Sequence, residues 1–475
     1  MTLVHILVFI VFTLLVRWLW PPHRRGWFIL VGSLLAVFWL QPSTPIRNLD
    51  FWLPAASIAL TVLTWAIVRP AQTSSRVPWV TGMILIVGSF LAVGLLRYIP
   101  GLCCLTPSRP PQLIQVLPAA VLTLVVFALL YRYSPGKNWV PGGAIALLIT
   151  LFVILKSPAL ASLASSGVRD LQGQSTELAT FTDLPWLGFS YLAFRLIHAL
   201  RDFQSNKLPP ASAEEFSVYA LFYPAVTAGP IDRLQRFLPD LRRAGQSEAV
   251  EDTIQGGKRI FYGIIKKFVL ADSLALISIN SQNAFQANST AWMWVMLYAY
   301  AFRLFFDFSG YTDIAIGLGR LAGIRLPENF DQPYLKPNLT AFWNSWHMTL
   351  AQWFRAYFFN PLTRSLRSRY RAFPAWSIIL IGQLSTMILI GLWHGITWSF
   401  FAWGAWHGSG LFIHNRWVEW RRSRAPAVVD SPSGSKISGF MGGLVTFHFV
   451  LLGWVWFAMP DPEIALDVFS KLFGR

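Results

Sequence analysis

The chain has 475 residues, of which 54% are hydrophobic and only 13% are charged, and its mean hydropathy is +0.48. Soluble domains carry about 25% charged residues, so this composition excludes an ordinary soluble protein. Apolar runs at residues 3–20, 51–68, 79–98 and 112–131 are each long enough to cross about 30 Å of hydrocarbon. We therefore expect an all-α integral membrane protein, built as a polytopic helical bundle.

The formal net charge is +17. Lysines and arginines collect in connecting loops, as at residues 24–25, 132–137 and 201–207, whereas the stretch 157–183 has an excess of acidic residues. Cytoplasmic loops carry an excess of basic residues and face anionic lipid. We therefore predict a multi-pass protein of the cell membrane, with the N-terminus outside and residues 201–215 in the cytoplasm. Contact with membrane lipid explains the charge without a nucleic-acid partner.

Taken in chain order, the apolar runs predict about eleven transmembrane helices. They are expected at residues 3–20, 26–40, 51–68, 79–98, 112–131, 139–155, 186–200, 292–308, 374–393, 397–414 and 437–459. Residues 216–229 are apolar but short and contain Pro224, so we expect a re-entrant element there. Residues 233–251 and parts of 317–373 are charged and are expected to form amphipathic helices, and residues 157–183 a polar loop.

A tryptophan-rich segment at residues 342–408 carries three histidines. An imidazole in apolar surroundings is costly to bury and titrates near neutral pH. His394 lies between Trp393 and Gly395 at the end of a long apolar run. A histidine hydrogen-bonded to a neighbouring helix is one interpretation. Its depth and its tryptophan and glycine neighbours favour a general base that takes the proton of a hydroxyl group.

His347 precedes His394 by 47 residues, so the two can meet only through folding. Together with Asn344 it supplies hydrogen-bond donors that suit a carbonyl group or a developing oxyanion. An interfacial helix with an aromatic belt is an equally good interpretation of this segment. His407 is expected to pack between helices. No His-x-x-x-His pattern or carboxylate–histidine cluster is evident, so we expect no metal site.

Two acidic residues, Asp307 and Asp313, lie in an apolar neighbourhood. Carboxylates at membrane depth line a cavity or pair with a cation. We expect structural ion pairs with Arg303 or Arg320.

Several segments together resemble the membrane-bound O-acyltransferase family, in particular a bacterial branch that includes alginate O-acetyltransferase and the D-alanyl transfer protein of teichoic acid synthesis. The matching segments occur in the family's order from about residue 185 onward, at residues 223–230, 263–272, 306–317, 328–330, 342–357 and 391–408. The resemblance implies an acyltransferase core at residues 185–475. It leaves residues 1–184 as transmembrane helices without a recognised motif.

The resemblance also implies site residues and substrates. His394 matches the family's invariant histidine, and His347 matches a second polar position that is His or Asn. Asn344, Trp346 and Trp393 are expected to bind substrate or to support the oxyanion. The fold is expected to enclose a tunnel, with an acyl thioester donor (acetyl-coenzyme A or an acyl-carrier protein) entering from the cytoplasm as a co-substrate and no permanently bound cofactor.

The function that this implies is transfer of an acyl group, with acetyl favoured, to a hydroxyl of an extracytoplasmic polysaccharide or lipid-linked glycan at the bacterial cytoplasmic membrane. Carrier or cell-envelope proteins are possible partners. One alternative is a D-alanyl-type transferase that works with a carrier protein. Another is a transporter or channel that uses intramembrane His and Asp residues. The sequence leaves open the acceptor, the acyl group, the donor, the oligomeric state and the role of the first helices.

Overall fold

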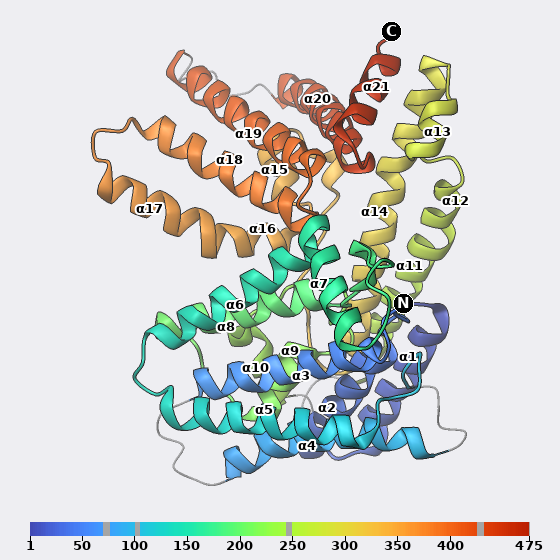
Figure 1. The fold of residues 1–475 in the computed structure, drawn as a ribbon. Coiled ribbons are helices and arrows are strands. Elements are labelled where there is room, and N and C mark those ends of the chain that lie inside the picture. The colour runs from blue at the N-terminus through green and yellow to red at the C-terminus, as the bar shows by residue number, and fades with distance from the viewer. Residues whose placement is uncertain (70–76, 100–104, 244–248, 425–431, 475) are drawn as a thin grey trace. The chain divides into compact units, whose positions relative to one another are not determined.

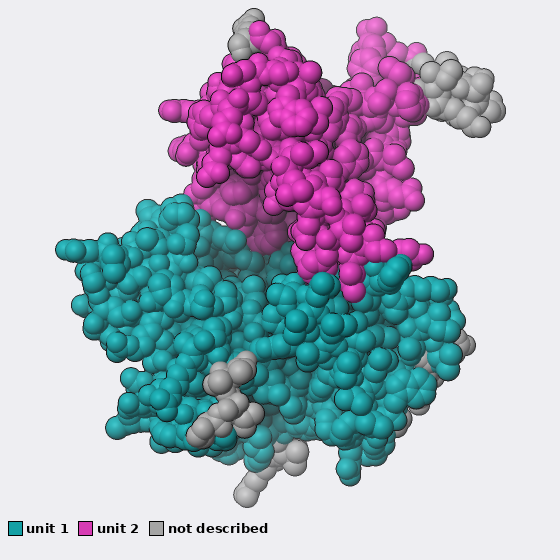
Figure 2. Space-filling model, turned by 90° about the vertical axis from the view of Figure 1, so that its right-hand side faces the viewer, with its two compact units in different colours: residues 1–261, 313–327 teal, residues 262–312, 328–475 magenta. Residues whose placement is uncertain are grey.

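The structure is a computed structural model, and it describes residues 1–69, 77–99, 105–243, 249–424 and 432–474. These residues form α-helices, short 3-10 and π turns and loops, with no β-strand (Figure 1). The chain packs into two compact units, distinguished by colour in Figure 2. Unit 1 comprises residues 1–261 and 313–327, and unit 2 comprises residues 262–312 and 328–475.

Six helical segments among the described residues are long and apolar enough to cross a membrane. They are α3 (Leu49–Val68), α4 with η1 (Trp79–Tyr98), α5 (Leu113–Tyr133), α6 (Trp139–Lys156), α18 (Ala375–His394) and the main part of α20 (Ser438–Ala458). The prediction of a polytopic helical membrane protein is therefore confirmed. The total of about eleven spans, the tunnel and the boundary at residue 184 stay predictions.

Helix α3 is the inner helix of unit 1. Its span is 72% buried, whereas the spans of α5 and α6 are each 17% buried and leave most of their apolar surface outward, as suits contact with lipid. Two polar side chains of α3 form hydrogen bonds within the fold. Thr61 donates to the carbonyl of Ser57 (2.8 Å), and the indole N–H of Trp65 donates to the carbonyl of Ala211 (3.0 Å).

A buried arginine joins the first helix, α1 (Leu3–Leu19), to the end of α14 (Thr290–Leu321) within unit 1. Arg17 is 5% exposed and donates to the carbonyl of Leu321 (2.8 Å). The last carbonyls of a helix have no partner within the helix, so a cation placed there caps it. Asp252 of α11 (Ala249–Ile264) balances the charge, at 3.5 Å from Arg17 and 3.3 Å from Arg320.

The prediction of a polar loop at residues 157–183 is wrong in part. The stretch contains the 14-residue helix α7 (Pro158–Leu171) and the 3-10 turn η2 (Phe181–Asp183). Proline at the first helical position and the alanine and leucine residues that follow favour the helix. The polar residues of the segment lie on one face of this amphipathic helix.

Asp183 holds the end of this segment against α7. Its carboxylate is almost fully buried and accepts hydrogen bonds from the Ser165 hydroxyl (2.7 Å) and the Arg169 guanidinium (2.8 Å). Burial by itself would raise the pKa of Asp183, but hydrogen bonds from Thr180, Ser165 and Arg169 outweigh it and lower the pKa to about 2. The charged form therefore stabilises the folded state.

We expect Asp183→Asn to destabilise the protein by about 3–5 kcal/mol, because it leaves Arg169 buried without its counter-charge. In the unmodified protein this contribution is present above the ordinary pKa of about 4 and is lost as the pH falls towards 2. Thermal unfolding in detergent between pH 3 and 7 measures both effects. A variant whose melting temperature equals that of wild type at pH 7 would contradict this account.

Residues 216–229 do not form a full span, as Pro224 predicts. Helix α9 (Ala213–Leu221) begins at a Ser212–Glu215 capping box and ends before the proline. The turn that follows is held by Arg195 of α8 (Phe189–Gln204), which is 2% exposed and donates to the carbonyls of Ala220 (2.9 Å) and Ala225 (2.8 Å). The expected amphipathic helix follows as α10 (Leu234–Arg243), and residues 244–248 lie outside the described part of the chain.

The helix expected at residues 292–308 continues to Leu321 as α14, past both acidic residues. Asp307 and Asp313 do form ion pairs, but the expected partners were wrong. Asp307 pairs with Lys267 of the π-helix η3 (Ile265–Ala271), and Asp313 pairs with Arg259 of α11, each at 2.5 Å. These cations neutralise the carboxylates, so the helix need not end at them.

In unit 2, α18 and α19 (Trp398–Arg424) run side by side at backbone contact (Figure 1). A Cβ at Gly391 would lie 2.2 Å from the carbonyl oxygen of Phe400, and one at Gly404 would lie 2.5 Å from that of Met387. Both positions therefore require glycine. The remaining helical elements of the unit are α12 (Asp272–Ala275), α13 (Ser281–Gln286), η4 (Pro333–Leu335), α15 (Leu339–Trp343), α16 (Met348–Phe354), the π-helix η5 (Arg355–Phe359), α17 (Asn360–Arg369), α20 (Pro432–Ala458) and α21 (Pro462–Leu472).

Candidate active site

His394 is the last residue of α18, where the close contact with α19 fixes the end of the helix. Its ring is half-buried among aromatic side chains. The ring centres of Trp393 and Phe457 lie 4.5 Å and 4.7 Å away, both edge-on. One turn before His394, Gly391 leaves room for the backbone of the neighbouring helix, since the carbonyl oxygen of Phe400 fills that space.

His347 stands at the start of α16 in a left-handed conformation, with φ 43° and ψ 53°. A residue other than glycine is uncommon there and is held in place by its surroundings. The side chain is buried, with the residue 4% exposed. Burial lowers the pKa of His347 to about 3, so the imidazole is neutral at pH 7 and is able to donate one hydrogen bond and to accept another.

Asn329 holds the turn at His347. It is fully buried, and its carbonyl accepts from the backbone N–H of Met348 (2.9 Å). Its side-chain oxygen accepts from the backbone N–H (3.2 Å) and the hydroxyl (2.8 Å) of Thr349. The sequence analysis assigned no role to Asn329. The only hint was that Asn329 lies in segment 328–330, one of the short segments that resemble the acyltransferase family.

The two histidines line one cavity of about 50 Å³ in unit 2. A single water needs about 10–15 Å³ of such space, so the cavity admits a group of only a few heavy atoms. Its walls are aromatic and aliphatic, and the lining contains no carboxylate. They are formed by Leu304, Phe308, Trp343, Trp346, His347, Leu350, Ala351, Ile390, His394, Trp403, Trp454 and Phe457.

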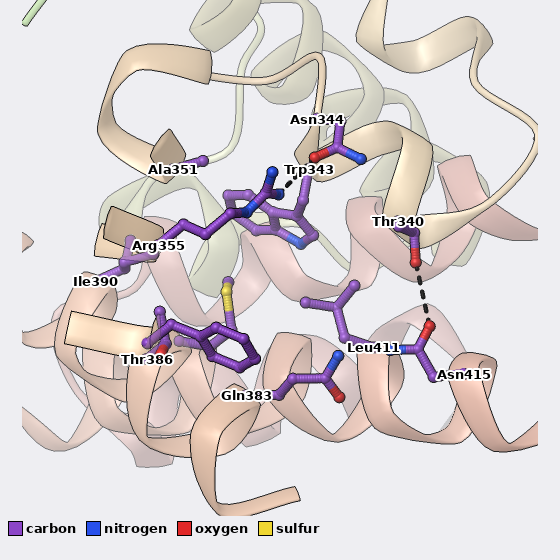
Figure 3. A pocket seen from close by; sticks show the side chains of 12 residues that line it. Thr340, Trp343, Asn344, Ala351, Arg355, Gln383, Thr386, Ile390, Leu411 and Asn415 are labelled. Atoms are coloured by element: carbon purple, nitrogen blue, oxygen red, sulfur yellow. Dashed lines mark hydrogen bonds between the residues drawn. The ribbon is translucent and has the colours of Figure 1, made fainter. Parts of the chain in front are cut away.

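The structure places the other expected site residues, Trp346, Trp393 and Asn344, at different positions around the two histidines. Trp346 lines the histidine cavity. Trp393 is not part of the lining, but its ring contacts both imidazoles, with centres 6.0 Å from His347 and 4.5 Å from His394. Asn344 lines a neighbouring cavity instead, where its side-chain oxygen accepts from the guanidinium of Arg355 at 2.6 Å (Figure 3).

His407 packs inside the aromatic cluster, as expected. It is fully buried, and its ring lies 4.9 Å from Trp403 and 5.1 Å from Trp343. Neither ring nitrogen has a hydrogen-bond partner among the described residues. Over the same residues, no three histidine, cysteine or carboxylate side chains come together as ligands for a metal ion.

Comparison with known proteins gives a family match. The model of the membrane-bound O-acyltransferase family matches residues 140–429. A teichoic acid D-alanyltransferase of Streptococcus thermophilus is 34% identical, over 58% of this chain and 68% of that protein. A "probable alginate O-acetylase" of Pseudomonas aeruginosa is 31% identical (61% and 51%), and a peptidoglycan O-acetyltransferase of Helicobacter pylori is 31% identical (55% and 46%).

The matched region of this chain thus spans about two thirds of the first relative and about half of the other two. The family model covers more than half of the chain and includes both cavity histidines. The chain therefore belongs to the membrane-bound O-acyltransferase family and is, by that membership, an acyltransferase.

Proposed function

We propose that the protein moves a short acyl group, with acetyl favoured, from a cytoplasmic thioester to a hydroxyl of an extracytoplasmic glycan or lipid-linked acceptor. The observation that carries the proposal is that His347 and His394, from segments far apart in sequence, line one small aromatic cavity. A base and a neutral hydrogen-bond donor in a dry site are what transfer between a thioester and an alcohol needs.

In this reaction, His394 accepts the proton of the acceptor hydroxyl while the oxygen attacks the thioester carbonyl carbon. His347 donates a hydrogen bond to the carbonyl oxygen, which becomes negative in the tetrahedral intermediate. The intermediate collapses with loss of the thiolate. The thiolate takes the proton from His394, so the products are an ester and a free thiol.

The size of the cavity supports a short acyl group. About 50 Å³ between rigid aromatic walls suits an acetyl or aminoacyl group and does not suit a long hydrocarbon chain. The relatives are named for D-alanyl transfer to teichoic acid, for acetylation of alginate and for O-acetyl transfer to peptidoglycan. These names support a cell-envelope polymer as acceptor and keep D-alanyl as the second candidate group.

The apolar helices and the basic loops support a place in the bacterial cytoplasmic membrane with the N-terminus outside. The donor would then reach the cavity from the cytoplasm as acetyl-coenzyme A or as a carrier-protein thioester.

The test compares host cells that lack the protein with the same cells carrying the wild-type chain or an empty vector. Envelope polymers and lipids are purified, and ester-linked acyl groups are released with mild base and identified by mass spectrometry. We expect acetate, or D-alanine for the second candidate, to appear only with the wild-type chain. Equal ester content in all cells would contradict acyl transfer and would favour the transporter alternative.

A further inference from the structure

An apolar cavity of about 580 Å³ lies in unit 1, between α1, α2 (Pro22–Trp39) and the end of α4 (Figure 1). It shares no lining residue with the cavity that holds the two histidines. Among its lining side chains, the indole nitrogen of Trp39 is the only polar atom. The lining residues are Val8, Phe9, Phe12, Gly32, Leu35, Ala36, Trp39, Ala92, Val93, Leu96 and Leu105.

The cavity has a buried floor and an exposed mouth. Phe9, Ala36 and Val93 form the floor and are 4%, 2% and 2% exposed. Val8 and Leu35, which are 46% and 41% exposed, mark the mouth.

The surface around the mouth is apolar as well. The same faces of α1 and α2 carry further exposed valines, at Val4, Val11 and Val31. In a polytopic membrane protein, such a surface faces the hydrocarbon of the bilayer. The mouth therefore opens sideways to lipid.

Aromatic contacts keep the cavity open. The ring of Phe12 packs on Gly32, where a Cβ would lie 2.4 Å from it. The ring of Phe9 lies 4.9 Å from that of Tyr223 and 5.7 Å from that of Trp39. Because these side chains are held by their neighbours, the cavity is preformed.

A hydrocarbon chain is the occupant that fits these walls. A buried water needs two to four polar partners, which this lining does not offer. An empty space would forfeit the dispersion contacts of the atoms around it. A dry cavity of about 150 Å³ holds one benzene molecule, so this cavity has room for a chain of roughly twenty carbon atoms.

Two arginines without an acidic partner follow the cavity at the end of α4. Leu96 lines the cavity, Arg97 is the next residue, and Arg109 donates to the carbonyl of Arg97 (3.1 Å). Neither arginine forms an ion pair among the described residues. Asp50, the carboxylate that contacts this loop, is 1% exposed and accepts from the backbone N–H (2.6 Å) and the hydroxyl (2.7 Å) of Ser108.

These arginines lie on the side of the membrane where basic residues are not expected. The charge of the loops places this end of α4 with the N-terminus, outside the cell, whereas basic residues collect in cytoplasmic loops. A guanidinium matches the geometry of a phosphate group, to which it donates two parallel hydrogen bonds. A phosphate ligand would therefore account for the position of the two arginines.

We propose that the cavity binds a hydrocarbon chain of an anionic glycerophospholipid, and that Arg97 and Arg109 bind the phosphate of the same lipid. The inference goes beyond the proposed function, because it assigns a lipid site to the amino-terminal helices. It does not depend on the acyl-transfer reaction.

The test titrates the full-length protein, purified in detergent and stripped of lipid, with dioleoylphosphatidylglycerol. Native mass spectrometry counts the bound lipid molecules and gives the Kd. Dioleoylglycerol, which lacks the phosphate, and glycerol 3-phosphate, which lacks the chains, are the paired controls. We expect one tightly bound phosphatidylglycerol per protein, and about tenfold weaker binding of dioleoylglycerol, because it makes no charge-assisted hydrogen bond.

Ala92→Trp fills the cavity from the exposed side of α4, and Ala146→Trp on the exposed side of α6 is the matched control. We expect Ala92→Trp to weaken phosphatidylglycerol binding about tenfold, because the chain loses buried apolar area, and Ala146→Trp to leave it unchanged. Val8→Trp fills the cavity from α1 and replaces Ala92→Trp if that variant fails to fold.

The double variant Arg97→Gln with Arg109→Gln tests the phosphate contact. It is expected to bind phosphatidylglycerol no more tightly than dioleoylglycerol. Arg132→Gln, at an exposed arginine in the last turn of α5, is the matched control and is expected to bind like wild type.

Equal binding of phosphatidylglycerol to wild type, the cavity variant and the arginine variant would overturn the inference. Preferential binding of a polyprenyl phosphate, added as a competitor, would overturn the assignment to a glycerophospholipid. Because binding is measured without turnover, these outcomes are distinct from failure of the proposed function, which is an unchanged ester content of the cell envelope.

Discussion

His394→Ala is expected to lower kcat for acyl transfer by about 10²–10⁴-fold, the usual contribution of a positioned general base. The substitution removes the group that takes the hydroxyl proton and leaves the backbone contact between α18 and α19 intact, because Gly391 and Gly404 make that contact. Initial rates of ester formation, measured at matched protein abundance and matched melting temperature, check the prediction.

The matched control is His407→Leu. His407 belongs to the same aromatic cluster but lies outside the cavity lining, and its ring nitrogens have no hydrogen-bond partner among the described residues. We expect this variant to keep wild-type activity and to be at least as stable, because it removes buried polar atoms. If both variants lose activity equally, the assignment of the base to His394 is wrong.

His347→Ala is expected to lower kcat by about 10²–10³-fold, the cost of losing one donor to a developing oxyanion, with a smaller effect on the KM of the thioester. The pKa of His347 is lowered to about 3 by burial, so this donor stays neutral between pH 5 and 8. Any change in the rate over that range must then come from another group, and kcat and KM profiles of wild type and variant measure this directly.

The variant His347→Asn distinguishes the loss of a hydrogen-bond donor from the loss of side-chain volume. An amide N–H also donates a hydrogen bond, so this variant is expected to retain more activity than His347→Ala. Asn329→Ala leaves the imidazole in place but removes the acceptor for Thr349, so it is expected to lower kcat and the melting temperature together. Equal rates for His347→Asn and His347→Ala would argue against a hydrogen-bond role.

The apolar runs predicted the helices that cross the membrane because lipid solvation acts on each residue locally. The errors arose where distant residues decide the outcome. Helix α14 passes through Asp307 and Asp313 because Lys267 and Arg259, 40 and 54 residues away, neutralise them. The local sequence cannot show such partners.

The same contrast between local features and distant contacts applies to the candidate site. The type and apolar surroundings of His394 singled it out, whereas the residues around His347 left two interpretations open; that the two line one cavity is shown by the fold, and their catalytic roles stay predictions. Asn344 was expected beside them because it is close in sequence, but the structure places its side chain in the adjoining cavity, across a shared wall that includes Trp343. Asn329 acts through hydrogen bonds to a turn that exists only in the folded chain, so its residue type alone gave no hint.

The backbone contact between α18 and α19 also determines how the acyl specificity can be engineered. On that side, the cavity is lined by Ile390, His394 and Trp403, and a larger residue at Gly391 or Gly404 would force the two helices apart. On the side of α20, it is bounded by the removable ring of Phe457. Variants with a smaller side chain at position 457 are therefore the route to a transferase for longer acyl groups, whereas variants along the α18–α19 seam would lose the fold before they gained room.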